Sequence, residues 1–119
     1  MGRKSYQGGC HCGAFKFEFE SEPITLACRC NCSICVRKNA LMSDAYLPPE
    51  AFGVLEGREA LTRYQFGDHL VNHYFCGTCG IYTCHAAVAK PDHLRINLGC
   101  VENLDARRLP VRELDGRSF

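Results

Sequence analysis

Residues 75–80 read FCGTCG, in which two cysteines are separated by two residues and followed by a second glycine. This pattern is typical of a zinc knuckle, a tight turn whose backbone amides approach two thiolates. A structural zinc site takes four protein ligands in a tetrahedron, so the knuckle needs a second pair of donors. The stretch CHCG at residues 10–13 supplies that pair. We therefore predict a structural zinc site, which fastens the N-terminal hairpin to later strands, formed by Cys10, Cys12, Cys76 and Cys79.

The chain of 119 residues contains ten cysteines, far more than is usual for this length. Disulfides explain such abundance in small secreted proteins, but the N-terminal stretch MGRKSYQGG has no apolar region typical of a secretory signal. Cysteines two residues apart are also poorly placed for a disulfide, whereas both can face one ion. In a reducing compartment the same abundance indicates metal or redox chemistry. We expect a cytoplasmic protein whose thiols chiefly bind metal.

A second concentration of thiols lies at residues 28–35, which read CRCNCSIC. Cys30, Cys32 and Cys35 can bind one ion and leave its fourth coordination position open. An open position distinguishes a catalytic from a structural zinc site. Cys28 is the alternative fourth ligand. In an extended strand its Cα atom lies about 13 Å from that of Cys32, whereas sulfurs on one zinc ion are about 3.8 Å apart. A closed four-cysteine site would therefore need a sharp bend in this stretch.

Three cysteines and five histidines remain outside these two groups. Free cysteine is among the most buried residue types, so we expect core packing for Cys28, Cys84 and Cys100. The dipeptide Cys84–His85 is the exception, because it lies just past the knuckle and can reach into an active cleft. The other histidines are predicted to be surface or strand-face residues rather than ligands: His11, His69, His73 and His93.

The hydrophobic pattern predicts short strands. In GAFKFEFE, residues 13–20, phenylalanines alternate with charged residues, the period of two that marks a half-buried antiparallel strand. Further strands are expected at TLACRC, VLEG, LTRYQF, LVNHYF and LRINLG, with a turn or one helical turn at residues 48–50. No stretch sustains the 3.6-residue period of a long helix. The predicted fold class is mainly β, with short antiparallel sheets bridged by zinc and little helix, in one domain over residues 1–119.

Charge and hydropathy exclude two classes of partner. Fourteen Lys and Arg residues face 13 Asp and Glu residues, a formal net charge of +1. This balance lacks the basic excess of a nucleic-acid-binding domain. No apolar run approaches the roughly 20 residues that span a bilayer. We expect neither nucleic acid nor membrane as a partner.

With these motifs in view, the chain resembles the glutathione-dependent formaldehyde-activating enzymes, also called S-(hydroxymethyl)glutathione synthases. The matching elements are GGCHCGAFKFE, CNCSICVRK and HYFCGTCGIYT, in the same order and spacing over nearly the whole chain. The resemblance implies a zinc-bridged fold of the β-tent type. It also implies a structural zinc at the first cysteine set and a catalytic zinc at Cys30, Cys32 and Cys35. We expect this second ion to be labile. The implied activity is that of a carbon–sulfur lyase, which joins formaldehyde to glutathione and runs the reverse reaction.

The expected partners are thus a small-molecule thiol such as glutathione and an aldehyde. Glutathione carries two carboxylates, so Arg37 and Lys38 are candidate substrate contacts, with a solvated surface pair as the alternative. Asn31, where many family members have histidine, can hydrogen-bond a metal-bound group or shape the turn. Two other functions stay open: a non-catalytic zinc-stabilised binding module, and a thiol redox or zinc-handling protein.

Overall fold

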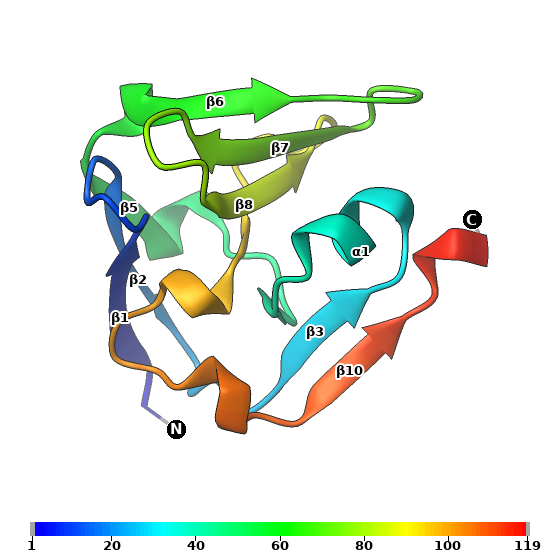
Figure 1. Cartoon of the computed structure of the whole chain (residues 1–119). Helices are drawn as coiled ribbons and strands as arrows, with labels where there is room; N and C mark the ends of the chain where they lie inside the picture. Colours follow the sequence, from blue (N-terminus) through cyan, green and yellow to red (C-terminus); the bar gives the residue numbers. More distant parts are fainter. Residues whose placement is uncertain (1, 119) are drawn as a thin grey trace.

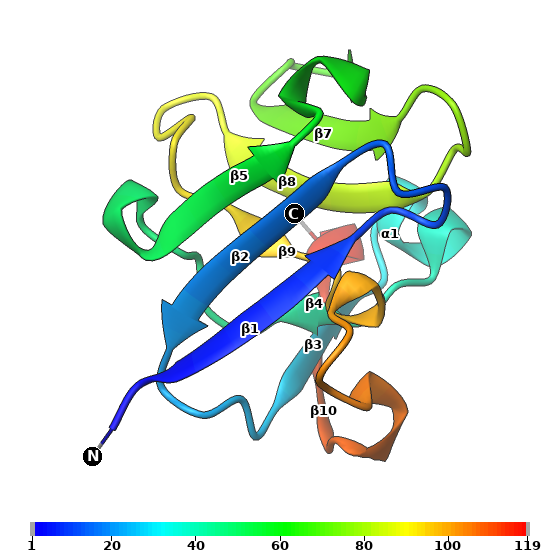
Figure 2. The same ribbon diagram turned by 90° about the vertical axis from the view of Figure 1, so that its left-hand side faces the viewer.

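The computed structural model describes residues 2–118 and contains three small β-sheets joined by loops and short helical turns (Figures 1 and 2). The first sheet has the order β1-β2-β5, with both pairs antiparallel. Its strands are β1 (Lys4–Gly9), β2 (Lys16–Ser21) and β5 (Phe52–Glu56). Figure 2 shows this sheet from its outer face.

The period-two pattern of residues 13–20 places its phenylalanines in the core, as predicted. Phe15, Phe17 and Phe19 are buried, whereas the charged residues between them are exposed. The ring of Phe19 stacks on that of Tyr6 at 5.1 Å, and the ring of Phe17 stacks on that of Phe52 at 5.4 Å. Aromatic pairs at such separations add to the free energy gained by burial.

The second sheet is antiparallel throughout and has the order β6-β7-β8-β9. Its strands are β6 (Leu61–Tyr64), β7 (Val71–Cys76), β8 (Tyr82–Ala87) and β9 (Arg95–Ile96). The pairing of β7 with β8 shifts register by one residue, so that Thr83 is an extra residue in β8. Such a bulge turns the side chains on its two sides toward the same face. As a result Tyr82 and His85, three residues apart, both face one side of the sheet.

The third sheet has the order β10-β3-β4 and departs from the prediction of antiparallel pairing. Its strands are β3 (Ala27–Cys30), β4 (Met42–Ser43) and β10 (Val111–Leu114). β3 pairs with β4 antiparallel but with β10 in parallel. Parallel neighbours need a long connection, and here most of the chain lies between the two strands. The short, charged sequence of β10 gave no strand signal, and β1 and β8 were not predicted either.

Helical structure is short, so the mainly β fold class with little helix is confirmed. The α-helix α1 (Ser33–Lys38) ends at Asn39, which adopts the left-handed conformation with φ of 48°. In Figure 1 this helix lies between the second sheet and the strands β3 and β10. The 3₁₀ turns are η1 (Pro49–Ala51), η2 (Arg58–Ala60), η3 (Leu98–Cys100), η4 (Ala106–Arg108) and η5 (Gly116–Ser118). Among residues 2–118 no helix has the length and apolarity that crossing a membrane requires.

Candidate metal centres and active site

Four cysteines from two distant parts of the sequence meet at one point. Cys10 and Cys12 lie in the loop between β1 and β2, while Cys76 and Cys79 form the turn between β7 and β8. Their four sulfurs all lie within 4.8 Å of one another, with 3.7 Å between Cys10 and Cys12 and 3.7 Å between Cys12 and Cys76. Sulfurs bound tetrahedrally to zinc are about 3.8 Å apart. The predicted four-cysteine group is therefore assembled with the spacing that zinc requires.

Backbone amides prepare this first group to bind a cation. The sulfur of Cys76 accepts hydrogen bonds from the amides of Thr78 at 3.4 Å and Cys79 at 3.5 Å. The amide of Cys79 lowers the pKa of the Cys76 thiol, and the amide of Ile81 lowers the pKa of Cys79 to about 6. Gly80 sustains the turn with φ of 79°. Thiolates in this setting fit a structural Zn²⁺.

The second group consists of three cysteines from one short stretch. Cys30 ends β3, Cys32 is the residue before α1, and Cys35 lies within that helix. Their sulfurs again lie within 4.8 Å of one another. Cys28 is 1% exposed, is paired inside β3 and does not belong to the group. The alternative of a closed site with Cys28 is thus not realised.

The leftover thiols are buried, as predicted. Cys28, Cys84 and Cys100 are all in the buried class. Cys84 faces an apolar pocket that also includes Phe15 and Leu94, on the face of β8 opposite to His85. The two halves of the Cys84–His85 dipeptide therefore belong to different environments. His85 is the half that hydrogen-bonds to Tyr82 and Tyr46.

The C-terminal turn covers one side of the second group, a feature that the sequence did not reveal. The side-chain nitrogen of Asn31 donates to the carboxylate of Asp115 at 2.9 Å, and the side-chain oxygen of Asn31 accepts from the backbone amide of Arg117 at 2.9 Å. Between them, Gly116 approaches the cluster so closely that a Cβ atom there would lie 2.5 Å from the sulfur of Cys30. These contacts favour the turn-shaping role for Asn31.

On the other side of the second group, α1 places Lys38 beneath the sheet. Its Nζ atom is buried, has no hydrogen-bond acceptor within the described residues, and lies 3.9 Å from the ring centroid of Tyr82. Burial lowers the pKa of this ammonium, and the neighbouring thiols, Cys35 first among them, act in the opposite direction. Burial also raises the pKa of the Cys35 thiol to about 12. Coordination to a metal ion would ionise this thiol.

Four aromatic side chains form a hydrogen-bonded chain beside Lys38. The hydroxyl of Tyr82 contacts Nδ1 of His73 at 2.6 Å and Nδ1 of His85 at 3.1 Å. Nε2 of His85 contacts the hydroxyl of Tyr46 at 3.2 Å. Burial lowers the pKa of His73 to about 4 and that of His85 to about 3. His73 was predicted to be a surface or strand-face residue; it is on a strand face, but it is buried.

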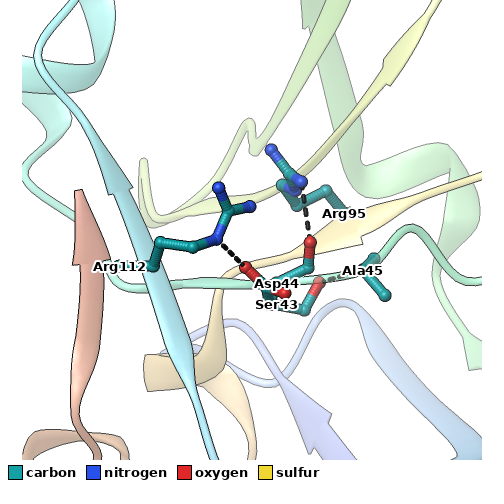
Figure 3. A network of polar contacts seen from close by, with 5 residues as sticks. All are labelled: Ser43, Asp44, Ala45, Arg95 and Arg112. Atoms are coloured by element: carbon teal, nitrogen blue, oxygen red, sulfur yellow. Dashed lines mark hydrogen bonds and ion pairs between the residues drawn. The ribbon is translucent and has the colours of Figure 1, made fainter. Parts of the chain in front are cut away.

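A polar network around Asp44 holds the outer end of this chain (Figure 3). Nε of Arg112 donates to the Asp44 carboxylate at 2.6 Å, and a terminal nitrogen of Arg95 donates to the Asp44 carbonyl at 2.8 Å. The Ser43 hydroxyl donates to the carbonyl of Ala45. The guanidinium of Arg95 in turn lies 4.5 Å from the ring centroid of Tyr46. The network thus links β10, β9 and the loop after β4, and it positions Tyr46.

A groove of about 350 Å³ runs along the outer side of α1. It is lined by Ser33, Ile34, Arg37, Tyr64 and Phe66. The ring of Phe66 stacks on that of His73 at 5.6 Å, so the groove lies above the inner end of the hydrogen-bonded chain. Arg37 is exposed and donates one hydrogen bond, at 2.8 Å, to the carbonyl of Ser33.

Comparison with known proteins identifies the family. The family model of the glutathione-dependent formaldehyde-activating enzyme matches residues 5–114. The chain belongs to this family. A crystal structure of a Rhodobacter sphaeroides protein is 36% identical and superposes with a TM-score of 0.75, over 89% of this chain and 99% of that one. Membership of the glutathione-dependent formaldehyde-activating enzymes confirms the resemblance inferred from the motifs and supports an enzymatic function related to glutathione and formaldehyde.

Proposed function

We propose that the protein is a carbon–sulfur lyase that joins a thiol to an aldehyde and splits the adduct, with glutathione, formaldehyde and S-(hydroxymethyl)glutathione as the reactants. The observation that carries this proposal is the three-cysteine group, which has no fourth protein ligand within residues 2–118 and adjoins α1, a helix that carries a buried ammonium and lines a groove. An open position distinguishes catalytic from structural metal sites.

The donor sets suit two zinc ions with different roles. The first would be held by Cys10, Cys12, Cys76 and Cys79, and would be purely structural. The second would be held by Cys30, Cys32 and Cys35, whose sulfurs have the mutual spacing that one ion requires. A zinc ion there would supply Lewis acidity and lower the pKa of a substrate thiol.

The groove beside α1 gives the thiol substrate a place to lie. Its aromatic wall suits the body of a small peptide, and Arg37 offers free guanidinium hydrogens to a carboxylate. Lys38 is placed on the inner side of the same helix, where its ammonium can donate to the oxygen of the aldehyde. These positions support a binding role for Arg37 and a role for Lys38 at the reacting end.

The reaction needs little beyond positioning and charge stabilisation. The sulfur lone pair forms a bond with the aldehyde carbon, the C=O π pair moves to oxygen, and the thiol proton ends on that oxygen. Lys38 would stabilise the negative charge that develops on oxygen, and the groove would align the sulfur with the carbon. Since thiols and aldehydes combine unaided, alignment supplies much of the rate.

The rate of adduct formation tests this proposal. We expect the wild-type protein to accelerate exchange between formaldehyde and S-(hydroxymethyl)glutathione, measured by NMR exchange spectroscopy. Cys32→Ser should fall to the uncatalysed rate and retain one zinc ion, whereas Cys100→Ala, which removes a buried thiol outside both groups, should retain two zinc ions and full activity. A wild-type rate equal to the uncatalysed one would favour the binding-module or zinc-handling function instead.

A further inference from the structure

The hydrogen-bonded chain of Tyr46, His85, Tyr82 and His73 is continuous. A phenol hydroxyl donates one hydrogen bond and accepts others, and a neutral imidazole donates from one nitrogen and accepts at the other. All three hydrogen bonds, at 3.2, 3.1 and 2.6 Å, can therefore run from donor to acceptor in the same direction along the chain. They can equally all point in the other direction. The chain thus has two arrangements of protons with the same heavy-atom positions.

The two ends of the chain lie in different environments. At the inner end, His73 is 4% exposed, and its Nε2 atom has no hydrogen-bond partner within the described residues. Phe66, which lines the groove, stacks on this ring. At the outer end, Tyr46 is 40% exposed. Buried polar atoms are usually hydrogen-bonded, so an unpartnered Nε2 at the end of a complete chain points to a group supplied from outside the protein.

We propose that Tyr46, His85, Tyr82 and His73 form a proton relay between the substrate groove and solvent. The proposal rests on the proposed function, because addition of a thiol to an aldehyde removes a proton from sulfur and later delivers one to oxygen. The cysteine group and Lys38 provide charge stabilisation but no route for that proton. The relay supplies the route.

The proton balance can be followed along the chain. In the first arrangement Nε2 of His73 has a lone pair, and its Nδ1–H donates to Tyr82. Tyr82 donates to Nδ1 of His85, whose Nε2–H donates to Tyr46, and that hydroxyl donates to water. When Nε2 of His73 accepts the thiol proton, each member passes its own proton outward, and one proton leaves to water. All four residues remain neutral, with every hydrogen bond reversed.

The return step restores the starting state. After the sulfur–carbon bond has formed and the C=O π pair has moved to oxygen, a proton from water enters at Tyr46. It passes inward, and Nε2 of His73 releases one proton to the alkoxide. The thiol has lost one proton and the product hydroxyl has gained one, so no oxidant, reductant or further reactant is required.

The surroundings of the chain keep both imidazoles neutral, as a relay requires. Burial is the main cause of the low pKa of both rings, and the positive charge of Lys38 adds to it. For His85 the charge of Arg95 contributes as well. A protonated imidazole has no acceptor nitrogen and would block the chain. The two cations flank the relay at the rings of Tyr82 and Tyr46.

The variant Tyr82→Phe tests the relay because it keeps the ring beneath Lys38 and removes the central hydroxyl. We expect kcat to fall by about 10²-fold, the range of general acid–base catalysis, with the KM for glutathione unchanged. The dependence of kcat on the D₂O fraction should be curved in the wild type, since several protons move together, and linear in the variant. The matched control Tyr74→Phe removes a phenol hydroxyl from the neighbouring strand β7 and should change neither quantity.

A second readout does not depend on activity. In the resting wild-type protein at pH 7, ¹⁵N NMR should show both rings as neutral, with Nδ1 of each shifted by hydrogen bonding, and Tyr82→Phe should remove both shifts. A charged ring, or unchanged Nδ1 signals in the variant, would overturn the relay. Equal kcat values for Tyr82→Phe and Tyr74→Phe, in the presence of clear wild-type acceleration, would overturn the relay alone. Absence of wild-type acceleration would overturn the proposed function and the relay together.

Discussion

The two cysteine groups use the same ligand atoms but differ in what they connect. The four-cysteine group joins residues 10–12 to residues 76–79 and so ties the first sheet to the second. The three-cysteine group spans only residues 30–35. Closing a long loop removes far more chain entropy than closing a short one. The first group can therefore stabilise the fold, whereas metal bound at the second constrains a single turn.

The surroundings of the two cysteine groups also differ. Around the first group, hydrogen bonds from backbone amides lower the pKa of Cys76 and Cys79 and so stabilise their thiolate forms. Around the second group lie a buried ammonium, a groove and a chain of neutral imidazoles and phenols. In this chain the short ligand spacing coincides with polar groups that have no partner among residues 2–118, as expected of a site that binds substrate.

Loss of one ligand from the four-cysteine group should have the largest effect. In Cys76→Ser we expect no folded protein at 25 °C, because structural zinc contributes about 10–16 kcal/mol of apparent binding energy in zinc-finger peptides. Typical domains have a net stability of only about 5–15 kcal/mol. The far-UV circular dichroism spectrum and the absence of a cooperative thermal transition would show the loss.

The matched variant is Cys32→Ser, which makes the same chemical change in the three-cysteine group. It should keep the wild-type spectrum and a cooperative transition, with zinc content reduced from two ions to one. If the two variants unfold alike, the distinction between a fold-supporting and a reactive group is wrong.

Much of this difference could be predicted from the sequence, because it is encoded in spacing. The knuckle at residues 75–80 and the pair at residues 10–13 identified the four-cysteine group, and the alternation at residues 13–20 identified the core face of β2. The distance argument also separated Cys28 from the other three thiols of its stretch. These features depend on neighbours in sequence, or on ligand number, which a sequence reveals directly.

The surroundings of the three-cysteine group could not be predicted, because they depend on register and on long-range packing. Tyr82 and His85 share a face only because Thr83 is an extra residue in β8, and nothing in that sequence marks the bulge. Likewise, β10 pairs in parallel with β3, and this pairing places Gly116 close to the sulfur of Cys30. Such contacts between distant segments have no local pattern.

An intermediate effect is expected from Gly116→Ala, which tests how the C-terminal turn supports the three-cysteine group. Gly116 has no left-handed φ, so the cost is steric: the new Cβ would lie 2.5 Å from the sulfur of Cys30 and 3.1 Å from Cβ of Cys32. Overpacking costs about 1–3 kcal/mol, or roughly 5–150-fold in affinity. Competition with a chromophoric chelator should show this loss for the second zinc only.

Gly53→Ala is the control for that experiment. A Cβ atom at Gly53, in β5, would meet only Cγ of Glu18 at 3.9 Å, an ordinary contact. Both zinc affinities should then match those of the wild type. An unchanged second-site affinity in Gly116→Ala would show that the C-terminal turn does not pack against the Cys30 sulfur in solution.

The last effect concerns the response of the region around the three-cysteine group to acid, and it accumulates gradually over several pH units. His85 has a pKa of about 3 in the folded protein, below the value of about 6.5 for an unperturbed histidine. Between these values the unfolded chain binds a proton that the folded protein does not, so the free energy of unfolding falls as the pH decreases. The contribution is at most about 1.4 kcal/mol per pH unit.

In His85→Gln the amide can still hydrogen-bond but does not titrate, so urea unfolding between pH 6.5 and 4 should show a shallower decline than in the wild type. Both proteins keep all ten cysteines and therefore the same candidate zinc ligands, so they are compared only at pH values where both still bind zinc. Identical slopes would mean that His85 takes up its proton in the folded protein at an ordinary pH, and the region around the three-cysteine group would then lack the neutral imidazole that sets it apart from the four-cysteine group.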